Sequence, residues 1–108
     1  MRVGIAGYGV VGKTRHRSIE ANTSYQVTAI SESNEHARTS IPQGLEVHND
    51  YKSLIASAQI DIIFISLPNQ FAAEATCLSL QKGLHVFCEK PPARRHAELL
   101  EVQKQSVK

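Results

Sequence analysis

Three glycines at fixed spacing constrain the fold of this chain more than any other feature of its sequence. They lie in the segment Gly7-Tyr8-Gly9-Val10-Val11-Gly12. Residues 3–6 before it are apolar and are predicted to form a strand, and the residues from Val10 to about Ala21 are compatible with a helix. A G-x-G-x-x-G pattern between a strand and a helix is typical of the first unit of a doubly wound α/β fold. The turn therefore predicts that fold class.

Strand and helix signals alternate along the rest of the chain. The clearest strand is Ile60-Asp61-Ile62-Ile63-Phe64-Ile65, whose nearly continuous apolar character indicates a parallel strand covered on both faces. Further strands are predicted at 26–30, 46–48 and 84–88, and helices at 34–40, 50–58, 69–82 and about 94–103. This alternation predicts one Rossmann domain over residues 1–108, with a parallel sheet of strand order 3-2-1-4-5 between two helix layers.

Specific residues are expected to begin, end and orient the helices. Asp50 and Asn69 are the predicted N-caps, and Gly83 is the predicted C-terminal glycine of the helix that Asn69 begins. The first of these helices carries Leu54, Ile55 and Ala58, and the second is expected to carry Phe71, Ala75, Leu78 and Lys82 on one stripe.

The glycine turn itself predicts a phosphate site. Gly7 permits a tight turn, Gly9 lets a pyrophosphate approach the backbone, and Gly12 lets the helix pack close to the sheet. Free N–H groups and the positive end of the helix dipole would then meet the phosphates. The alternative is a glycine-rich turn that serves packing alone.

Glu32 is the candidate for cofactor selectivity. It follows the second predicted strand, about twenty positions beyond the glycine turn, where an acid accepts hydrogen bonds from the adenosine ribose. A carboxylate there repels a 2′-phosphate, and Ser33 is not an arginine that would bind one. We therefore expect NAD rather than NADP as the cofactor. A solvated surface glutamate remains the alternative.

Two predicted strands end in unusual residues, at the edge of the sheet where doubly wound folds bind ligands. The fourth ends in Ser66-Leu67-Pro68-Asn69 and the fifth in Glu89-Lys90-Pro91-Pro92. A lysine beside the nicotinamide side of the crevice can assist proton transfer to or from an alcohol oxygen. Lys90 is therefore the candidate catalytic residue, and a polar turn ended by prolines is the alternative.

The glycine turn, Pro68-Asn69 and Glu89-Lys90-Pro91 together resemble the glucose–fructose oxidoreductase / inositol dehydrogenase / rhizopine-catabolism (Gfo/Idh/MocA) family over essentially the whole chain. The resemblance implies an NAD(P)-dependent oxidoreductase of sugars, inositols or related polyols. It implies that Lys90 lies near the nicotinamide and the reacting hydroxyl, that Glu89 positions the nicotinamide ribose, and that Leu67-Pro68-Asn69 lines the cofactor. Family members often carry a histidine three residues after the asparagine that matches Asn69, and this chain has Ala72 at that position. The substrate domain, which also carries the family's oligomer interface, is expected to be absent, so the chain alone should be inactive.

Composition excludes several other classes. The net charge of +2 and the absence of a basic stripe argue against nucleic acid, and no apolar run is long enough to span a membrane. Met1-Arg2-Val3 leads directly into a strand, so we expect no signal peptide and a cytoplasmic location. Cys77 and Cys88 do not form a CxxC pair, and the histidines do not complete a metal site, so reduced thiols and no metal are expected.

Two side chains near the glycine turn stay open on the sequence alone. Tyr8 can pack on the adenine side or face solvent, and His16 is expected on the helix surface rather than at the cofactor. Two rival functions also stay open. One is a dinucleotide-binding module without turnover, and the other, less favoured because of the glycine turn and Lys90, is a domain that binds S-adenosylmethionine.

Overall fold

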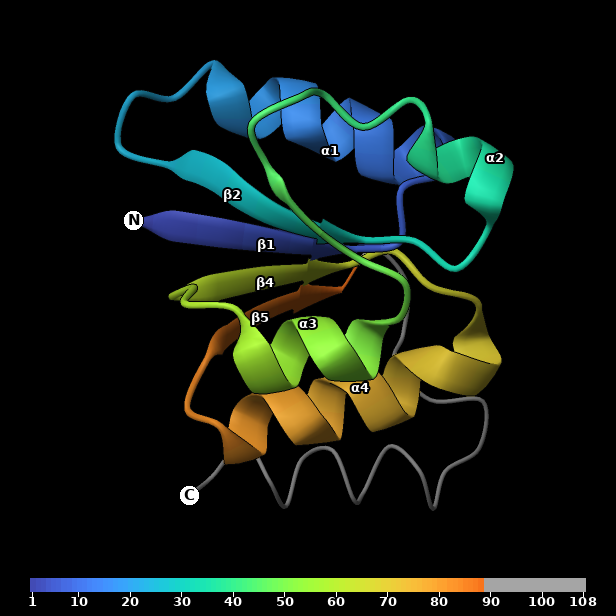
Figure 1. Cartoon of the computed structure of the whole chain (residues 1–108). Helices are drawn as coiled ribbons and strands as arrows, with labels where there is room; N and C mark the ends of the chain where they lie inside the picture. The colour runs from blue at the N-terminus through green and yellow to red at the C-terminus, as the bar shows by residue number, and fades with distance from the viewer. Residues whose placement is uncertain (89–108) are drawn as a thin grey trace.

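The computed structural model describes residues 1–88 of the chain. These residues form a five-stranded parallel sheet of order β3-β2-β1-β4-β5 between two helix layers (Figure 1). Helices α1 and α2 lie on one side and α3 and α4 on the other. The strands are β1 (Arg2–Ala6), β2 (Gln26–Ser31), β3 (Glu46–His48), β4 (Ile62–Ile65) and β5 (His85–Cys88), and the helices are α1 (Val10–Glu20), α2 (Glu35–Arg38), α3 (Tyr51–Ser57) and α4 (Asn69–Gln81). The predicted fold class and strand order are confirmed.

Two apolar cores fill the space between the layers. Val3, Ile5 and Ile30 belong to the core on the α1 side, and Leu54, Ile63 and Ile65 belong to the core under α3 and α4. Consecutive residues of β4 thus contribute to both cores, which is why the sequence of that strand is apolar without alternation. The sheet holds the carboxyl ends of all its strands at one edge.

Helix α4 differs from its prediction in both its start and its buried face. Pro68, not Asn69, is the N-cap, and its carbonyl accepts hydrogen bonds from Phe71 N and Ala72 N at 2.9 and 3.1 Å. The buried residues are Ala72, Ala75, Thr76 and Ser79. The two hydroxyls donate to carbonyls one turn back, at Ala72 O (2.8 Å) and Ala75 O (2.7 Å), so small residues let the helix pack closely without unpaired groups.

Other helix signals are confirmed, and the start of one strand is corrected. The Asp50 carboxylate accepts from Ser53 N at 2.7 Å as the cap of α3, and Gly83 has a φ of +87° after α4. The ammonium of Lys82, just after α4, donates to the carbonyls of Ile55 and Ala56 at the end of α3. Strand β4 begins at Ile62 rather than Ile60, after Asp61 has exchanged hydrogen bonds with the backbone of Arg2.

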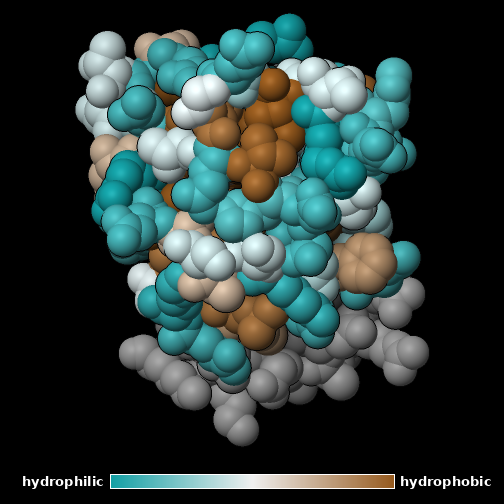
Figure 2. Space-filling view, viewed as in Figure 1, coloured by the Kyte–Doolittle hydropathy of each residue, from teal (hydrophilic) through white to brown (hydrophobic). Residues whose placement is uncertain are grey.

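One face of the sheet at β4 and β5 carries exposed aromatic surface. The rings of Phe64 and Phe87 stack with centroids 5.0 Å apart, and Phe87 is 54% exposed. Elsewhere, Figure 2 shows a mostly hydrophilic surface with two separate hydrophobic patches. Within residues 1–88, no helix has the length and apolar character needed to cross a membrane. The helix predicted at 94–103 lies outside the described residues.

Candidate functional site

The glycine turn joins β1 to α1 at the carboxyl edge of the sheet. Gly7 has a φ of +96°, a conformation that favours glycine, and its N–H donates to Ser31 O at 2.9 Å. A Cβ on Gly7 would lie 2.4 Å from Ser66 O, and one on Gly12 would lie 2.1 Å from Gly7 O. Both glycines are therefore required by close packing of the turn against β4 and α1.

Gly9 differs from the other two because it faces open space. A Cβ there would meet nothing within 4 Å, and no side chain caps the start of α1. The first bond of the helical ladder runs from Lys13 N to Gly9 O at 3.0 Å, so the amides of Val10, Val11 and Gly12 precede that ladder. The arrangement leaves backbone donors and the positive end of the helix dipole at an accessible point, which suits an anionic group.

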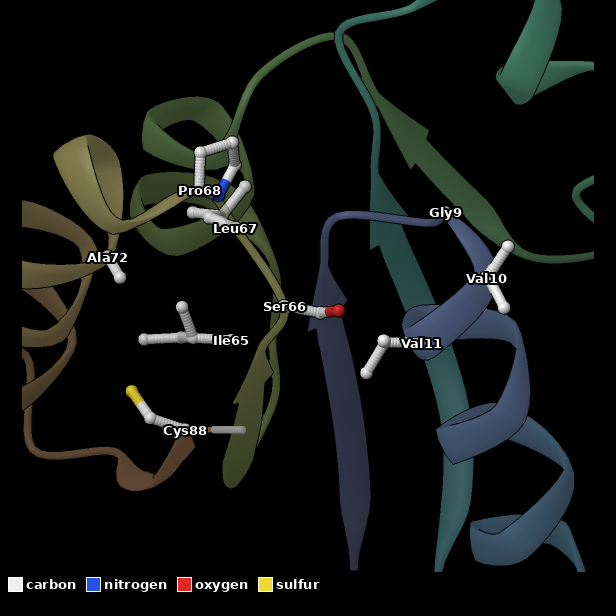
Figure 3. A pocket seen from close by; sticks show the side chains of 9 residues that line it. All are labelled: Gly9, Val10, Val11, Ile65, Ser66, Leu67, Pro68, Ala72 and Cys88. Carbon is white, nitrogen blue, oxygen red and sulfur yellow. The ribbon is translucent and has the colours of Figure 1, made fainter. Parts of the chain in front are cut away.

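A first hollow opens on the β4–β5 side of the glycine turn, with a volume of about 290 Å³. In Figure 3, Val11 and Gly9 border it from α1, Ser66 points its hydroxyl toward that helix, and the side chains of Ile65 and Cys88 lie on the opposite side. The nine lining residues are Gly9, Val10, Val11, Ile65, Ser66, Leu67, Pro68, Ala72 and Cys88. The hollow is mostly apolar, and it lies at the last described residue before Glu89 and Lys90.

A second hollow, of about 360 Å³, opens on the β2 side of the same turn. It shares Gly9 and the segment 66–68 with the first, so the two hollows meet at the glycine turn. Its other lining residues are Gly7, Ser31, Glu32, Ser33, Asp50, Tyr51 and Phe71. A ligand with an anionic middle and two ring-bearing ends would fit this pair of hollows, and that is the shape of a dinucleotide.

Glu32 lies at the end of β2, and its carboxylate already has two partners. Oε1 accepts from Tyr8 N at 2.7 Å and Oε2 accepts from Asn34 N at 3.0 Å. A carboxylate can accept about four hydrogen bonds in all, so it keeps capacity for hydroxyl donors in the second hollow. The carboxylate is thus both a wall of the hollow and a tie between β2 and the glycine turn.

Arg38 is a residue near this loop that the sequence reasoning missed. Its Nη1 donates to Glu32 O at 2.9 Å and to Ser33 O at 3.1 Å, from one turn of helix further along the chain. The guanidinium therefore stiffens the loop that carries Glu32. A spacing rule that examines only the residue after Glu32 cannot find it, because the arginine reaches back from α2.

Tyr51 and Phe71 were also missed as lining residues. They follow β3 and β4, and their ring centroids lie 6.2 Å apart at an angle of 44°. Burial and a hydrogen bond with Glu74, helped by the charges of Glu74 and Asp50, raise the pKa of Tyr51 to about 12. The position of both residues just beyond strand ends was the available signal, since ligands in such sheets bind beyond the carboxyl ends.

Both expectations for Tyr8 are wrong, and so is the surface position of His16. Tyr8 is 4% exposed and packs in the core on the α1 side, with its hydroxyl 2.8 Å from His16 Nδ1. His16 is 7% exposed, because it turns inward from α1 toward this hydroxyl. Burial raises the pKa of the Tyr8 phenol, and the charge of Arg17 opposes that shift. Only the backbone of Tyr8 remains at the turn.

The other predicted site residues divide into three groups. Gly9, Leu67 and Pro68 line both hollows, Val10 and Val11 line the first, and Gly7 and Glu32 line the second. Asn69 is the first residue of α4, is exposed, and lines neither hollow. Glu89 and Lys90 lie outside the described residues.

Comparison with known proteins agrees with this architecture. The family model described as "Oxidoreductase family, NAD-binding Rossmann fold" matches residues 1–108. A D-glucoside 3-dehydrogenase of Escherichia coli is 32% identical over 101 residues, which cover 86% of this chain and 28% of that protein.

Two solved structures superpose on almost the whole chain. The apo scyllo-inositol dehydrogenase of Lactobacillus casei is 25% identical with a TM-score of 0.91, and covers 99% of this chain and 33% of its own. The biliverdin reductase of Synechocystis, solved with biliverdin and NADP⁺, is 26% identical with a TM-score of 0.88, and covers 98% and 34%. The chain thus spans about a third of the length of these relatives. By its fold, its glycine turn and the match over residues 1–108, the chain belongs to the Gfo/Idh/MocA oxidoreductase family and corresponds to its NAD-binding Rossmann domain.

Proposed function

We propose that this chain is the cofactor-binding part of an NAD-dependent oxidoreductase that acts on a sugar, an inositol or a related polyol. The observation that carries the proposal is the pair of hollows that meet at Gly9, beside the amides that precede the hydrogen-bond ladder of α1. The names of the relatives support the substrate class, since they include a glucoside dehydrogenase and an inositol dehydrogenase.

The chain's own residues divide the binding work. Glu32 accepts the adenosine ribose hydroxyls, and Tyr51 and Phe71 contact the adenine beside it. The amides at the start of α1 bind the pyrophosphate over Gly9, where nothing fills the space that a Cβ would take. The apolar hollow between Val11, Ile65 and Cys88 takes the nicotinamide and excludes water from its face. Leu67 and Pro68 line the path between the two ends.

The bound dinucleotide supplies the hydride chemistry, and the protein supplies position and proton transfer. We assign the proton transfer to Lys90, whose Nζ would exchange a proton with the substrate hydroxyl, and the orientation of the nicotinamide ribose to Glu89. Both follow directly on Cys88, which lines the nicotinamide hollow. We also propose that the substrate is a sugar or polyol and that copies of the protein associate into a homo-oligomer.

The cofactor part of the proposal is tested by calorimetric titration with NADH and NADPH. We expect tighter binding of NADH, because the Glu32 carboxylate repels a 2′-phosphate, and we expect Glu32→Ala to narrow the difference. Glu35→Ala is the matched control, because Glu35 is an exposed glutamate in the first turn of α2. Equal or tighter binding of NADPH by the unsubstituted chain would contradict the assignment of NAD.

A further inference from the structure

Tyr8 is held at both its backbone and its side chain. Its N–H donates to Glu32 Oε1 at 2.7 Å, and its hydroxyl lies 2.8 Å from His16 Nδ1 in the interior. It stands between Gly7 and Gly9, whose backbones have the wide conformational freedom of glycine. The shape of the turn therefore depends on the residue between them.

His16 completes a chain of polar contacts that runs back to the surface of α1. Its Nε2 lies 3.1 Å from Glu20 Oε1, one helical turn away. A carboxylate can only accept, so Nε2 donates to Glu20, and Nδ1 shares its hydrogen bond with the Tyr8 hydroxyl. The rings of Tyr8 and His16 also meet edge to face, with centroids 5.7 Å apart at 61°.

This contact is directional in a way that apolar packing is not. An apolar pair at these two positions would fill the same volume without fixing the angle of either side chain, whereas a buried hydroxyl must be aimed at its acceptor because an unpaired one costs free energy. The hydrogen bond therefore sets where the Tyr8 ring lies against α1. Because the ring is attached to the turn, it also sets where the backbone at Gly9 lies relative to the first amides of that helix.

We propose that His16 is a positioning residue for the phosphate-binding turn: it fixes Tyr8, and through Tyr8 the backbone that faces the pyrophosphate. The inference rests on the proposed function, which places the pyrophosphate over Gly9. His16 is not among the residues that line either hollow, and its contact with the glycine turn runs through Tyr8.

Two substitutions at one position separate the two contacts of the histidine. Asn at 16 places a polar atom where Nδ1 was and keeps a partner for the Tyr8 hydroxyl, whereas Gln places one where Nε2 was and keeps the partner for Glu20. We therefore compare His16→Asn, His16→Gln and Tyr8→Phe. The ligands are ADP, which carries the diphosphate, and adenosine, which lacks it. Urea unfolding checks that each variant is folded.

We expect His16→Gln and Tyr8→Phe each to weaken ADP binding roughly three- to tenfold, the size of one hydrogen bond. Adenosine affinity should not change, and His16→Asn should retain most of the ADP affinity. The double variant Tyr8→Phe/His16→Gln should lose no more than either single variant, because both remove the same bond.

Equal losses for ADP and adenosine would overturn the proposal in favour of a general structural role. Unchanged ADP affinity in His16→Gln would also overturn it, while leaving the proposed function intact. If the unsubstituted chain binds neither ADP nor adenosine, the proposed function itself fails and this inference fails with it.

Discussion

Gly12 touches Gly7 so closely that no side chain fits between them, since a Cβ on Gly12 would lie 2.1 Å from the Gly7 carbonyl oxygen. The obstacle is backbone, which cannot move aside as the end of a flexible side chain can. Gly12→Ala should therefore push α1 away from the turn and lower the free energy of unfolding by about 3 kcal/mol. Urea unfolding followed by circular dichroism measures this loss.

Gly9→Val should have the opposite effect: it should abolish NADH binding and change stability little. Open space surrounds the position, and its φ of −80° and ψ of −158° suit a β-branched residue. Loss of stability should stay near 1 kcal/mol, the cost of a poorer N-cap. Binding of NADH should vanish, because the isopropyl group occupies the path of the pyrophosphate.

The two glycine variants serve as controls for each other. One is expected to lose stability and the other to lose binding, although both change the same turn. If Gly9→Val binds NADH normally in a calorimetric titration, the phosphates lie elsewhere. If Gly12→Ala is as stable as the unsubstituted chain, α1 does not depend on this contact.

The fold could be predicted because its determinants are local in the sequence. Apolar runs, caps and the glycine turn each act over a few residues, and together they leave few topologies. The buried face of α4 could not be predicted in the same way. Helical spacing places Phe71 on one stripe with Ala75, but Phe71 is 42% exposed, and the fully buried positions of the helix hold small side chains such as Ala75 and Ser79. That limit on size is set by the neighbouring layers and not by the helix itself.

The candidate site was predictable where it follows from backbone position. The glycine turn and Glu32 occupy the expected edge of the sheet, because their place is fixed by strand ends. Tyr8, His16 and Arg38 were not predictable, since each reaches a partner on another element. Sequence spacing predicts the backbone position of a residue, whereas its side-chain partners depend on how the elements pack.

Tyr51 should ionise at a higher pH than an ordinary tyrosine. Its pKa of about 12 results first from burial, then from the hydrogen bond and charge of Glu74. In the unfolded chain a tyrosine ionises near pH 10. The contribution of Tyr51 to stability is therefore complete below about pH 10 and is lost as the pH rises through 12.

Alkaline titration followed at the phenolate absorbance tests this prediction. Tyr51→Phe should remove a transition near pH 12 and should flatten the fall in stability between about pH 10 and 12. Tyr25→Phe is the control, because Tyr25 lies away from both hollows and is 36% exposed. A late transition that survives in Tyr51→Phe would contradict the assignment.

The exposed aromatic pair on β4 and β5 should make the isolated chain self-associate. Phe87 stacks on Phe64 beside α1 and is 54% exposed; exposed aromatic surface of this kind favours association. Sedimentation should show a concentration-dependent increase in mass, and Phe87→Ser should reduce it. Val47→Ser on β3 is the control, since Val47 is 47% exposed on the opposite edge strand. Equal association in both variants would place the contact elsewhere.

The last prediction concerns turnover, and it begins from what the described residues can hold. The walls of the first hollow, which we propose for the nicotinamide, come from the glycine turn, α1, α4 and the ends of β4 and β5. All of them lie at one edge of the sheet, so they can orient a cofactor but present no opposing wall for a sugar. Holding a substrate in attack geometry is worth up to ~7–11 kcal/mol of the barrier in favourable cases.

The 108-residue chain should therefore bind NAD(H) but show no measurable dehydrogenase activity of its own. In the proposed function Lys90 supplies only proton transfer, and any charge in a water-filled crevice is screened, which weakens its help to a developing alkoxide. The measurement is NADH formation across a panel of sugars and inositols, at a chain concentration above the Kd for NAD. Lys90→Ala is the control for background reduction, and it should match the unsubstituted chain at the limit of detection. Turnover by the unsubstituted chain that disappears in Lys90→Ala would contradict the prediction, because it would show that residues 1–108 position a substrate and transfer its proton without a second wall.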